Sequence, residues 1–231
     1  MLAILVLIII VFGFFYFTKA QKQTISVLTV APLVTEKLSG KYYTADLSYP
    51  QSSAAKYSEV YNFATSTVQD FLSQAENISD SDAKIMNLGG DRKYNLVITT
   101  RVATSTQTIT YILSAYTFMG GAHGNTDVET FTYDALGKLV TLDDFFAAPY
   151  LEKVADLSRT YFYNTLGDYA NPEMIDPGTT ATSTNFSAWY PTDQNITFIF
   201  QQYQVGPYVI GMPEFSIAKS DLSDIISAKF K

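Results

Sequence analysis

The stretch KYNLVITTRVATSTQTITYILSAYTF, residues Lys93 to Phe118, decides the fold class. Apolar and polar side chains alternate through its first part and again through its second, with the polar segment Thr104 to Thr108 between them. Alternation with a period of two is the pattern of a strand with one buried face. Two such runs joined by a short polar segment are typical of a hairpin. The stretch therefore predicts two antiparallel strands.

A helix is predicted on the N-terminal side of this hairpin, between Ala54 and Ala75. Apolar residues recur there at the three- and four-residue steps of one helix face: Tyr57, Val60, Tyr61, Ala64, Val68, Phe71, Leu72 and Ala75. Ser52 and Ser53 precede the helix and are candidate caps. Before them, the alternating segment KLSGKYYTADLSYPQ, residues 37–51, predicts a strand that ends in a turn.

The C-terminal half repeats this plan in outline. Its predicted elements are a hairpin around Leu136-Gly137-Lys138, a helix over residues 151–162, a polar loop over 167–183, strands in NITFIFQQY and EFSIA, and a short final helix capped by Ser220. We therefore predict an α+β fold of antiparallel sheets with packed helices, in two halves of similar order, preceded by one N-terminal transmembrane helix. The predicted segments are a transmembrane anchor over 1–18, a tether or first strand over 19–35, an N-terminal α+β domain over 36–115 and a C-terminal α+β domain over 116–231.

Composition narrows the classes of function. The chain has 231 residues, of which 47% are apolar, and this suffices for one large domain or two small ones. Seventeen tyrosines and sixteen phenylalanines favour strands. A net charge of -7 repels nucleic-acid phosphates, so we expect no nucleic-acid partner and a better fit to a cationic one. The chain has no cysteine, which excludes disulfides, thiolate catalysis and cysteine-bound zinc.

The N-terminal run MLAILVLIIIVFGFFYF, Met1 to Phe17, has no charged side chain. At 1.5 Å per residue it would form a helix of roughly 26 Å, close to the hydrocarbon thickness of a bilayer. A cleaved signal peptide is the alternative, but the segment around Lys19 offers a poor cleavage site. We therefore predict an uncleaved, single-pass membrane anchor.

The C-terminal half carries a family resemblance. The motif GGAHGN, residues 120–125, is followed by TLDDFF and then by FIFQQYQVGPYVIGMPEFSIAKSDL, residues 198–222. Together they resemble the C-terminal extracytoplasmic domain of RsiV-type anti-sigma factors, which also occurs before the catalytic domain of PdaC-type peptidoglycan deacetylases. The portion from YYTADLSYPQ to YILSAY is similar to the partner domain that precedes it. The resemblance spans about Glu36 to Phe230.

This resemblance implies an extracytoplasmic domain, which in the anti-sigma members binds lysozyme as a sensor. Sigma-factor control and deacetylation are not expected to transfer, because no segment precedes the apolar run and no deacetylase domain follows Phe230. The position of Lys19 and Lys22 after the apolar run would place the globular part in the cytoplasm. We follow the resemblance and expect the globular part outside the cell membrane.

His123, the single histidine, decides between classes of function. Gly120, Gly121 and Gly124 around it suggest positive φ angles or close backbone packing, and Asn125 also tolerates a left-handed conformation. We interpret the segment as a motif turn that His123 fastens through hydrogen bonds. The residue could instead belong to a binding surface or act as a base. With no second histidine and no cysteine, a zinc site is excluded, and no cofactor is expected.

The loop YQVGPYVIG, Tyr203 to Gly211, is the second candidate. Its glycines and proline prevent a regular strand, and it carries Tyr203, Pro207 and Tyr208. Rigid aromatic side chains on an irregular loop are typical of binding hot spots, although tyrosines packed inward are an equal alternative. The predicted ligand-binding residues are Tyr203, Pro207, Tyr208, His123 and Asn125.

Other candidates have structural interpretations. Asp143 and Asp144 precede a predicted helix and are interpreted as N-terminal caps rather than as a carboxylate pair. Trp189 is interpreted as a core residue rather than as part of a sugar-stacking platform with Tyr190.

Two classes of function remain. The first is a membrane-anchored extracytoplasmic binding or sensor domain, which recognises peptidoglycan, another cell-wall component or a cationic lysozyme-type protein. The second is a cell-envelope hydrolase that uses His123 with a carboxylate such as Asp127 or Asp144. We prefer the first and predict no enzymatic activity, because no Gly-x-Ser-x-Gly segment marks a nucleophile.

Overall fold

The computed structural model describes residues 28–51 and 56–231. The predicted membrane anchor over 1–18 lies outside these residues. No helix in the described part of the chain is both long and apolar enough to cross a bilayer.

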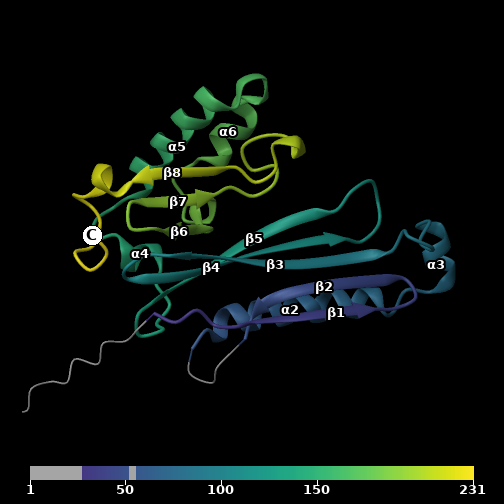
Figure 1. Ribbon diagram of the computed structural model, residues 1–231. Helices are drawn as coiled ribbons and strands as arrows, with labels where there is room; N and C mark the ends of the chain where they lie inside the picture. The colour runs from purple at the N-terminus through teal and green to yellow at the C-terminus, as the bar shows by residue number, and fades with distance from the viewer. Residues whose placement is uncertain (1–27, 52–55) are drawn as a thin grey trace, which may run out of the picture.

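Two sheets and a few helices build the molecule (Figure 1). The strands are β1 (Leu33–Ser39), β2 (Tyr43–Pro50), β3 (Tyr94–Thr104), β4 (Thr108–Phe118), β5 (Asn125–Asp134), β6 (Trp189–Pro191), β7 (Asn195–Ile199) and β8 (Glu214–Ala218). The helices are α2 (Ser58–Ala75), α3 (Asp80–Ile85), α4 (Leu142–Phe145), α5 (Leu151–Thr165) and α6 (Pro172–Gly178), with 3-10 turns η1 (Gly167–Tyr169), η2 (Thr184–Phe186), η3 (Tyr208–Ile210) and η4 (Lys219–Leu222). The predicted α+β class is confirmed.

The larger sheet has the strand order β1-β2-β3-β4-β5, and the smaller has β6-β7-β8. The predicted hairpin over Lys93 to Phe118 is confirmed as the antiparallel pair β3–β4. One pair departs from the predicted antiparallel pattern, because β2 runs parallel to β3. Helices α2 and α3 lie between them in the chain, and such a crossover returns the chain to the same end of the sheet.

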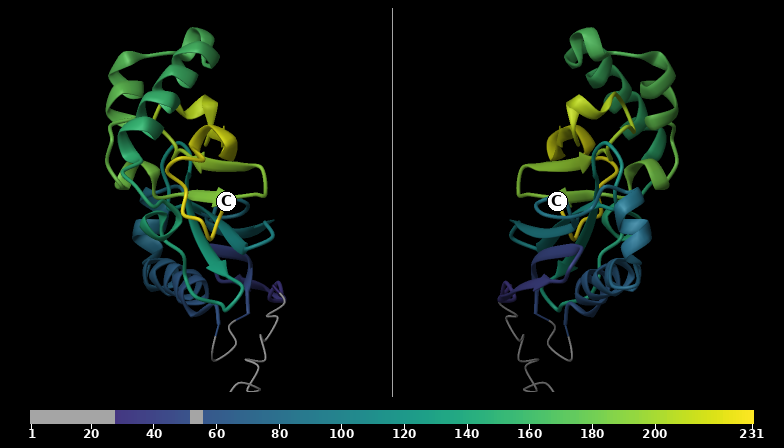
Figure 2. Two further views of the ribbon diagram at one scale, coloured as in Figure 1. Left: turned by 90° about the vertical axis from the view of Figure 1, so that its left-hand side faces the viewer. Right: turned by 90° about the vertical axis from the view of Figure 1, so that its right-hand side faces the viewer.

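The layers are stacked as helix, sheet, sheet and helices. Helix α2 covers one face of the larger sheet, where Val60 and Phe71 pack with Leu96. Helix α5 covers the outer face of the smaller sheet, where Phe162 packs with Phe198. Figure 2 shows α5 and α6 at the opposite end of the molecule from α2. The smaller sheet packs on the larger through Ile112, Val128, Ala188, Tyr190 and Ile199.

The predicted segment boundaries need correction. Strand β1 starts at Leu33, so the end expected for the tether, at residue 35, falls within a strand. The boundary expected between residues 115 and 116 falls within β4. Strand β5, expected in the second domain, pairs with β4 along its whole length and completes the larger sheet. Along the chain, strand, helices and strands do recur after β4, but the smaller sheet contains only the strands that follow the helices, because β5 belongs to the larger sheet.

Helix α2 begins at Ser58 rather than at Ala54. Tyr57 has a left-handed backbone (φ 67°) and cannot continue a helix in the N-terminal direction. Its buried ring packs edge-on against Tyr111 and Tyr133, at centroid distances of 5.2 and 5.0 Å, and this packing holds the residue in place. The predicted caps Ser52 and Ser53 lie outside the described residues.

Other local predictions have mixed outcomes. The helix over 151–162 and the strand EFSIA are confirmed as α5 and β8. The hairpin around Gly137 is reduced to one bridge between Tyr133 and Leu139. The polar loop over 167–183 contains α6, and the final helix capped by Ser220 is wrong, since that residue lies inside the 3-10 turn η4.

The interpretation of Trp189 as a core residue is confirmed, and that of Asp143 and Asp144 as caps is confirmed in part, because both lie in the first turn of α4 but neither is its N-cap. Thr141 is the N-cap of α4, and the Asp144 carboxylate accepts hydrogen bonds from the Thr141 backbone N–H and hydroxyl at 3.0 and 2.9 Å. These contacts form a capping box, and they lower the pKa of Asp144. Trp189 is buried and its ring lies 5.3 Å from that of Phe145.

Candidate functional site: an exposed aromatic cluster

Three of the predicted binding residues meet at the surface. The rings of His123 and Tyr208 lie 4.3 Å apart between centroids, and those of Tyr203 and Tyr208 lie 5.8 Å apart. The Tyr203 hydroxyl is 3.4 Å from Nε2 of His123. All three side chains are exposed, Tyr203 by 46% and Tyr208 by 37%. We call His123, Tyr203 and Tyr208 the aromatic cluster.

The turn that carries His123 depends on its glycines. Gly120 and Gly121 have φ angles of 93° and 87°, in the region that favours glycine. A Cβ atom at Gly124 would lie 2.5 Å from the ring of Tyr116, so this position requires the close approach that glycine allows. From outside the turn, Arg92 donates a hydrogen bond to the Gly121 carbonyl at 2.6 Å.

His123 does not fasten this turn as a buried residue would. Its side chain is exposed, and Nδ1 lies 2.9 Å from the carbonyl oxygen of the adjacent Gly124. Among the described residues, its other hydrogen-bond and ring contacts are with Tyr203 and Tyr208 of the distant loop. The imidazole therefore makes one hydrogen bond within the turn and also joins the turn to the loop.

The loop is held against β5 by glutamine side chains. Gln201 accepts a hydrogen bond from the Val128 backbone N–H at 3.0 Å and donates to the Val128 carbonyl at 2.7 Å. Gln202 accepts from the Thr126 N–H at 2.8 Å. Strand β5 is the last strand of its sheet, so these side chains satisfy backbone groups on its outer edge.

Gln204 attaches the same loop to the helical layer. Its Nε2 donates to the carbonyls of Gly178 and Asn185, both at 2.9 Å, and its Oε1 accepts from the Gln201 N–H. Tyr203 lies among these anchored glutamines and has a left-handed backbone (φ 66°). This conformation costs a residue other than glycine roughly 1–2 kcal/mol. Such strain persists only where the surroundings impose it, and it is concentrated at functional sites.

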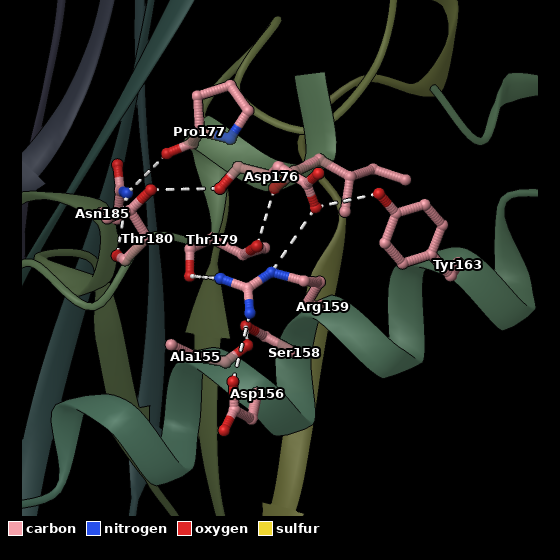
Figure 3. Close-up of polar contacts among 11 residues, drawn as sticks. Ala155, Asp156, Ser158, Arg159, Tyr163, Asp176, Pro177, Thr179, Thr180 and Asn185 are labelled. Atoms are coloured by element: carbon pink, nitrogen blue, oxygen red, sulfur yellow. Dashed lines mark hydrogen bonds and ion pairs between the residues drawn. The ribbon is translucent and has the colours of Figure 1, made fainter. Parts of the chain in front are cut away.

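A polar network supports the segment to which Gln204 binds (Figure 3). Arg159 of α5 donates to the Thr179 carbonyl at 3.3 Å and pairs with Asp176 at 3.6 Å. Asn185 donates to two carbonyls of the same segment. A Cβ atom at Gly178 would lie 2.0 Å from the Gln204 carbonyl oxygen, so only glycine permits this approach. The position of Tyr203 thus depends on α5 and α6.

The two remaining predicted residues lie beside the cluster. Pro207 precedes η3, the turn that carries Tyr208, and its carbonyl accepts from the Ile210 N–H. Asn125 is the exposed first residue of β5 and donates to Asp127 at 3.1 Å. Its backbone pairs in the ladder with Thr117 and is not left-handed as the sequence allowed.

The geometry around His123 provides little for hydrolysis. In the described part of the chain, His123 forms no hydrogen bond or ion pair with a carboxylate or a serine hydroxyl. The two carboxylates considered as its partners are otherwise engaged, Asp127 with Asn125 and Asp144 with Thr141. Within residues 28–51 and 56–231, no group of three or more histidine, aspartate and glutamate side chains is arranged to hold a metal ion.

Sequence reasoning missed the residues that position the cluster. The segment QQYQ contains three long amide side chains around one tyrosine, and each amide can both donate and accept. That composition was the available signal for an anchored loop. Arg92 offered no comparable signal, because its carbonyl acceptor belongs to a turn elsewhere in the chain.

Two family models match the chain, one over each sheet. Residues 36–126 match the family described as Deacetylase PdaC, and residues 143–220 match the one described as Protein of unknown function (DUF3298). The chain is 26% identical over 233 residues to the peptidoglycan-N-acetylmuramic acid deacetylase PdaC of Bacillus subtilis strain 168. This alignment covers 94% of the chain but 48% of the relative, so the chain spans about half of that protein's length.

Solved structures of two DUF3298 proteins are similar in fold. The Bacteroides fragilis NCTC 9343 protein is 19% identical with a TM-score of 0.60, and 85% of this chain and 93% of that one are covered. The Pseudomonas aeruginosa PAO1 protein is 17% identical with a TM-score of 0.52, and the coverage is 86% and 96%. At these identities the likeness shows the fold alone. The comparisons therefore associate this chain with DUF3298 and PdaC domains. The resemblance to RsiV-type anti-sigma factors rests on the sequence motifs alone.

Proposed function

We propose that the chain is a membrane-anchored, extracytoplasmic binding domain that recognises a cell-wall component through the aromatic cluster. The observation that carries the proposal is the convergence of His123, Tyr203 and Tyr208 on an exposed surface. Exposed rings in fixed positions offer flat faces to a ligand at a low entropic cost. The imposed strain at Tyr203 supports a functional role, since packing alone does not require an exposed ring there.

Peptidoglycan is the ligand that we favour. The curated relative is named as a deacetylase of peptidoglycan N-acetylmuramic acid. The RsiV-type resemblance instead suggests a cationic lysozyme-type protein, and the net charge of -7 would attract one. However, Arg92 and Lys93 line the same hollow as His123, and their charges oppose a cationic partner at this place.

The apolar run Met1 to Phe17 would hold the domain at the outer face of the cell membrane, within reach of the wall. The test is protease treatment of spheroplasts that carry the full chain with a C-terminal tag. We expect loss of the tag without permeabilisation. Protection of the tag in intact spheroplasts would reverse this orientation.

Binding is tested by sedimentation of the full chain, in detergent micelles, with purified peptidoglycan sacculi. Replacing both Tyr203 and Tyr208 by alanine should weaken binding by roughly 10- to 100-fold, since hot-spot side chains each contribute more than about 1 kcal/mol. The control is Tyr169→Ala, because Tyr169 is 48% exposed and makes no ring contact with the cluster.

Each outcome decides between the classes of function. Wild-type chain that fails to sediment with sacculi would contradict the proposal, and binding to lysozyme in a parallel assay would then favour the RsiV-type interpretation. Release of soluble fragments from sacculi, abolished by His123→Ala, would favour the hydrolase. Equal binding by the double variant and by Tyr169→Ala would contradict the role of the cluster.

A further inference from the structure

An open groove begins at His123 and extends over the end of the larger sheet. Strands β2, β3 and β4 contribute Thr44, Asn95, Tyr116 and Phe118, while His123 contributes to the wall. Its volume is about 910 Å³. Ligand sites in proteins typically range from about 300 to 1,000 Å³. The groove is therefore large enough for an extended ligand that also reaches the aromatic cluster.

Two cations lie in this groove, in a chain whose net charge is negative. The Arg92 guanidinium lies over the Phe118 ring, 5.1 Å from its centroid, and donates to the Gly121 carbonyl. Lys93 donates to the Gly40 carbonyl at 3.0 Å. Among the described residues, neither side chain has a carboxylate within ion-pair distance. Both keep unused donors, because a guanidinium has five and an ammonium three.

The acidic residue of the lining is Asp91, which is exposed beside Arg92. The groove thus holds two positive side chains and one negative side chain, besides His123. This excess of positive charge favours an anionic group on the ligand.

The floor of the groove offers a neutral donor and acceptor pair. Nδ2 of Asn95 donates to Oγ1 of Thr44 at 3.0 Å. Within the described residues, this contact leaves Oδ1 of Asn95 as an acceptor and the Thr44 hydroxyl proton as a donor. An acetamido group needs one of each, because it presents one N–H and one carbonyl. The half-buried rings of Tyr116 and Phe118 add apolar area beside this pair.

We propose that this groove binds a carboxylate-bearing, N-acetylated glycan, with Arg92 and Lys93 on the carboxylate and Asn95 and Thr44 on the acetamido group. The inference rests on the proposed function and names the chemical class of the cell-wall ligand. N-acetylmuramic acid combines both groups in one sugar. A neutral N-acetylated glycan would satisfy Asn95 and Thr44 but would leave the two cations without a partner.

The test compares two tetrasaccharides by calorimetry with the full chain in detergent micelles. One is the peptide-free tetrasaccharide of alternating N-acetylglucosamine and N-acetylmuramic acid, and the other is neutral tetra-N-acetylchitotetraose. We expect the wild type to bind the first at least tenfold more tightly. Lys93→Gln should reduce this preference at least threefold, because glutamine can still donate to the Gly40 carbonyl but carries no charge for the ligand carboxylate.

The matched control is Lys84→Gln, since Lys84 is exposed on the neighbouring α3 and does not line the groove. It should leave the preference unchanged, whereas Asp91→Asn should maintain or increase it. Equal affinity of the wild type for both tetrasaccharides would overturn the inference, and so would equal effects of Lys93→Gln and Lys84→Gln. If sacculi still bind in a cluster-dependent manner in either case, the proposed function stands without this ligand class.

Discussion

Strand β5 runs between two glycine turns that are held in different ways. At its C-terminal end, Gly137 has a φ of 79°, and the carboxylate of the buried Asp134 accepts the backbone N–H groups of Leu136 and Lys138. The Lys229 ammonium forms an ion pair with the same carboxylate, with Nζ 2.8 Å from Oδ2 of Asp134. At its N-terminal end, the turn around His123 contains no such carboxylate. Instead, Arg92, which precedes β3, donates a hydrogen bond to the Gly121 carbonyl.

The difference separates a turn whose polar groups the fold itself uses from one that we propose to serve binding. The turn at Gly137 satisfies its polar groups through its own Asp134 and the C-terminal segment. The turn at Gly121 leaves an exposed imidazole, whose hydrogen bonds within the described residues are to the Gly124 carbonyl and to a distant loop. Polar groups that the fold itself uses contribute to stability, whereas exposed groups with spare hydrogen-bonding capacity remain free for a ligand. Substitutions in the two turns should therefore affect different measurements.

The largest expected effect on stability is that of Asp134→Asn. Removing the charge weakens contacts to Lys229 and to two backbone N–H groups, so the free energy of unfolding at pH 7 should fall by about 1–3 kcal/mol. Urea denaturation measures this change. Asp127→Asn, at the exposed end of the same strand, should change it by less than about 0.5 kcal/mol. A reduced affinity of Asp134→Asn for sacculi would contradict the purely structural role of the turn at Gly137.

The effect of Asp134 should also depend on pH. Burial raises the pKa of its carboxyl, but the hydrogen bonds from Lys229, Lys138 and Leu136 outweigh burial, and the net pKa is lowered from 3.8. A lowered folded-state pKa stabilises the fold above the unfolded value and loses this contribution as the pH falls through the folded value. The stability difference between wild type and Asp134→Asn should therefore shrink below about pH 3.8. A constant difference down to complete acid unfolding would contradict this assignment.

Matched glycine substitutions come next. Gly121→Ala and Gly137→Ala each place a Cβ atom on a residue with positive φ, which should lower the free energy of unfolding by about 1–2 kcal/mol. At Gly137 the nearest atoms belong to the flexible Lys56 side chain, and nothing lies within 4 Å at Gly121, so the two costs should be similar. Only Gly121→Ala should weaken sedimentation with sacculi, because it displaces His123. Equal losses of binding would remove the distinction between the turns.

Tyr203→Gly should separate stability from binding in the partner loop. Glycine relieves the left-handed strain, so the stability should equal that of the wild type or exceed it by up to about 1 kcal/mol. Binding to sacculi should fall about tenfold through loss of the ring. Tyr203→Ala is the control, because it removes the ring but keeps the strain. If thermal unfolding shows both variants to be equally destabilised, the left-handed backbone at Tyr203 does not carry the expected strain.

The smallest effect on stability is expected for His123→Ala. Its imidazole is exposed, so the free energy of unfolding should change by less than about 0.5 kcal/mol. Binding to sacculi should nevertheless weaken about fivefold, because the ring contacts both tyrosines of the cluster. A stability loss above about 1 kcal/mol would favour the interpretation of a histidine that fastens its turn.

Local patterns predicted much of the fold. Alternation identified β2, β3, β4 and β7, and the helical spacing identified α5 and most of α2. Helix α6 was missed although Asn171 and Pro172 are a strong start signal, with Asn171 accepting the Glu173 N–H as the N-cap. The start of α2 could not be predicted, because the left-handed Tyr57 is imposed by Tyr111 and Tyr133, which are distant in sequence.

Local sequence features were sufficient to indicate which segments could form a site. Three glycines around one histidine and two tyrosines on an irregular loop are local features, because backbone freedom and loop composition are properties of a few adjacent residues. The meeting of His123 with Tyr203, 80 residues apart, was decided by tertiary structure. It requires Gln201 and Gln202 on the edge of β5 and Gln204 on the α6 segment. Periodicity contains no information about such pairings, since each depends on how separate layers pack.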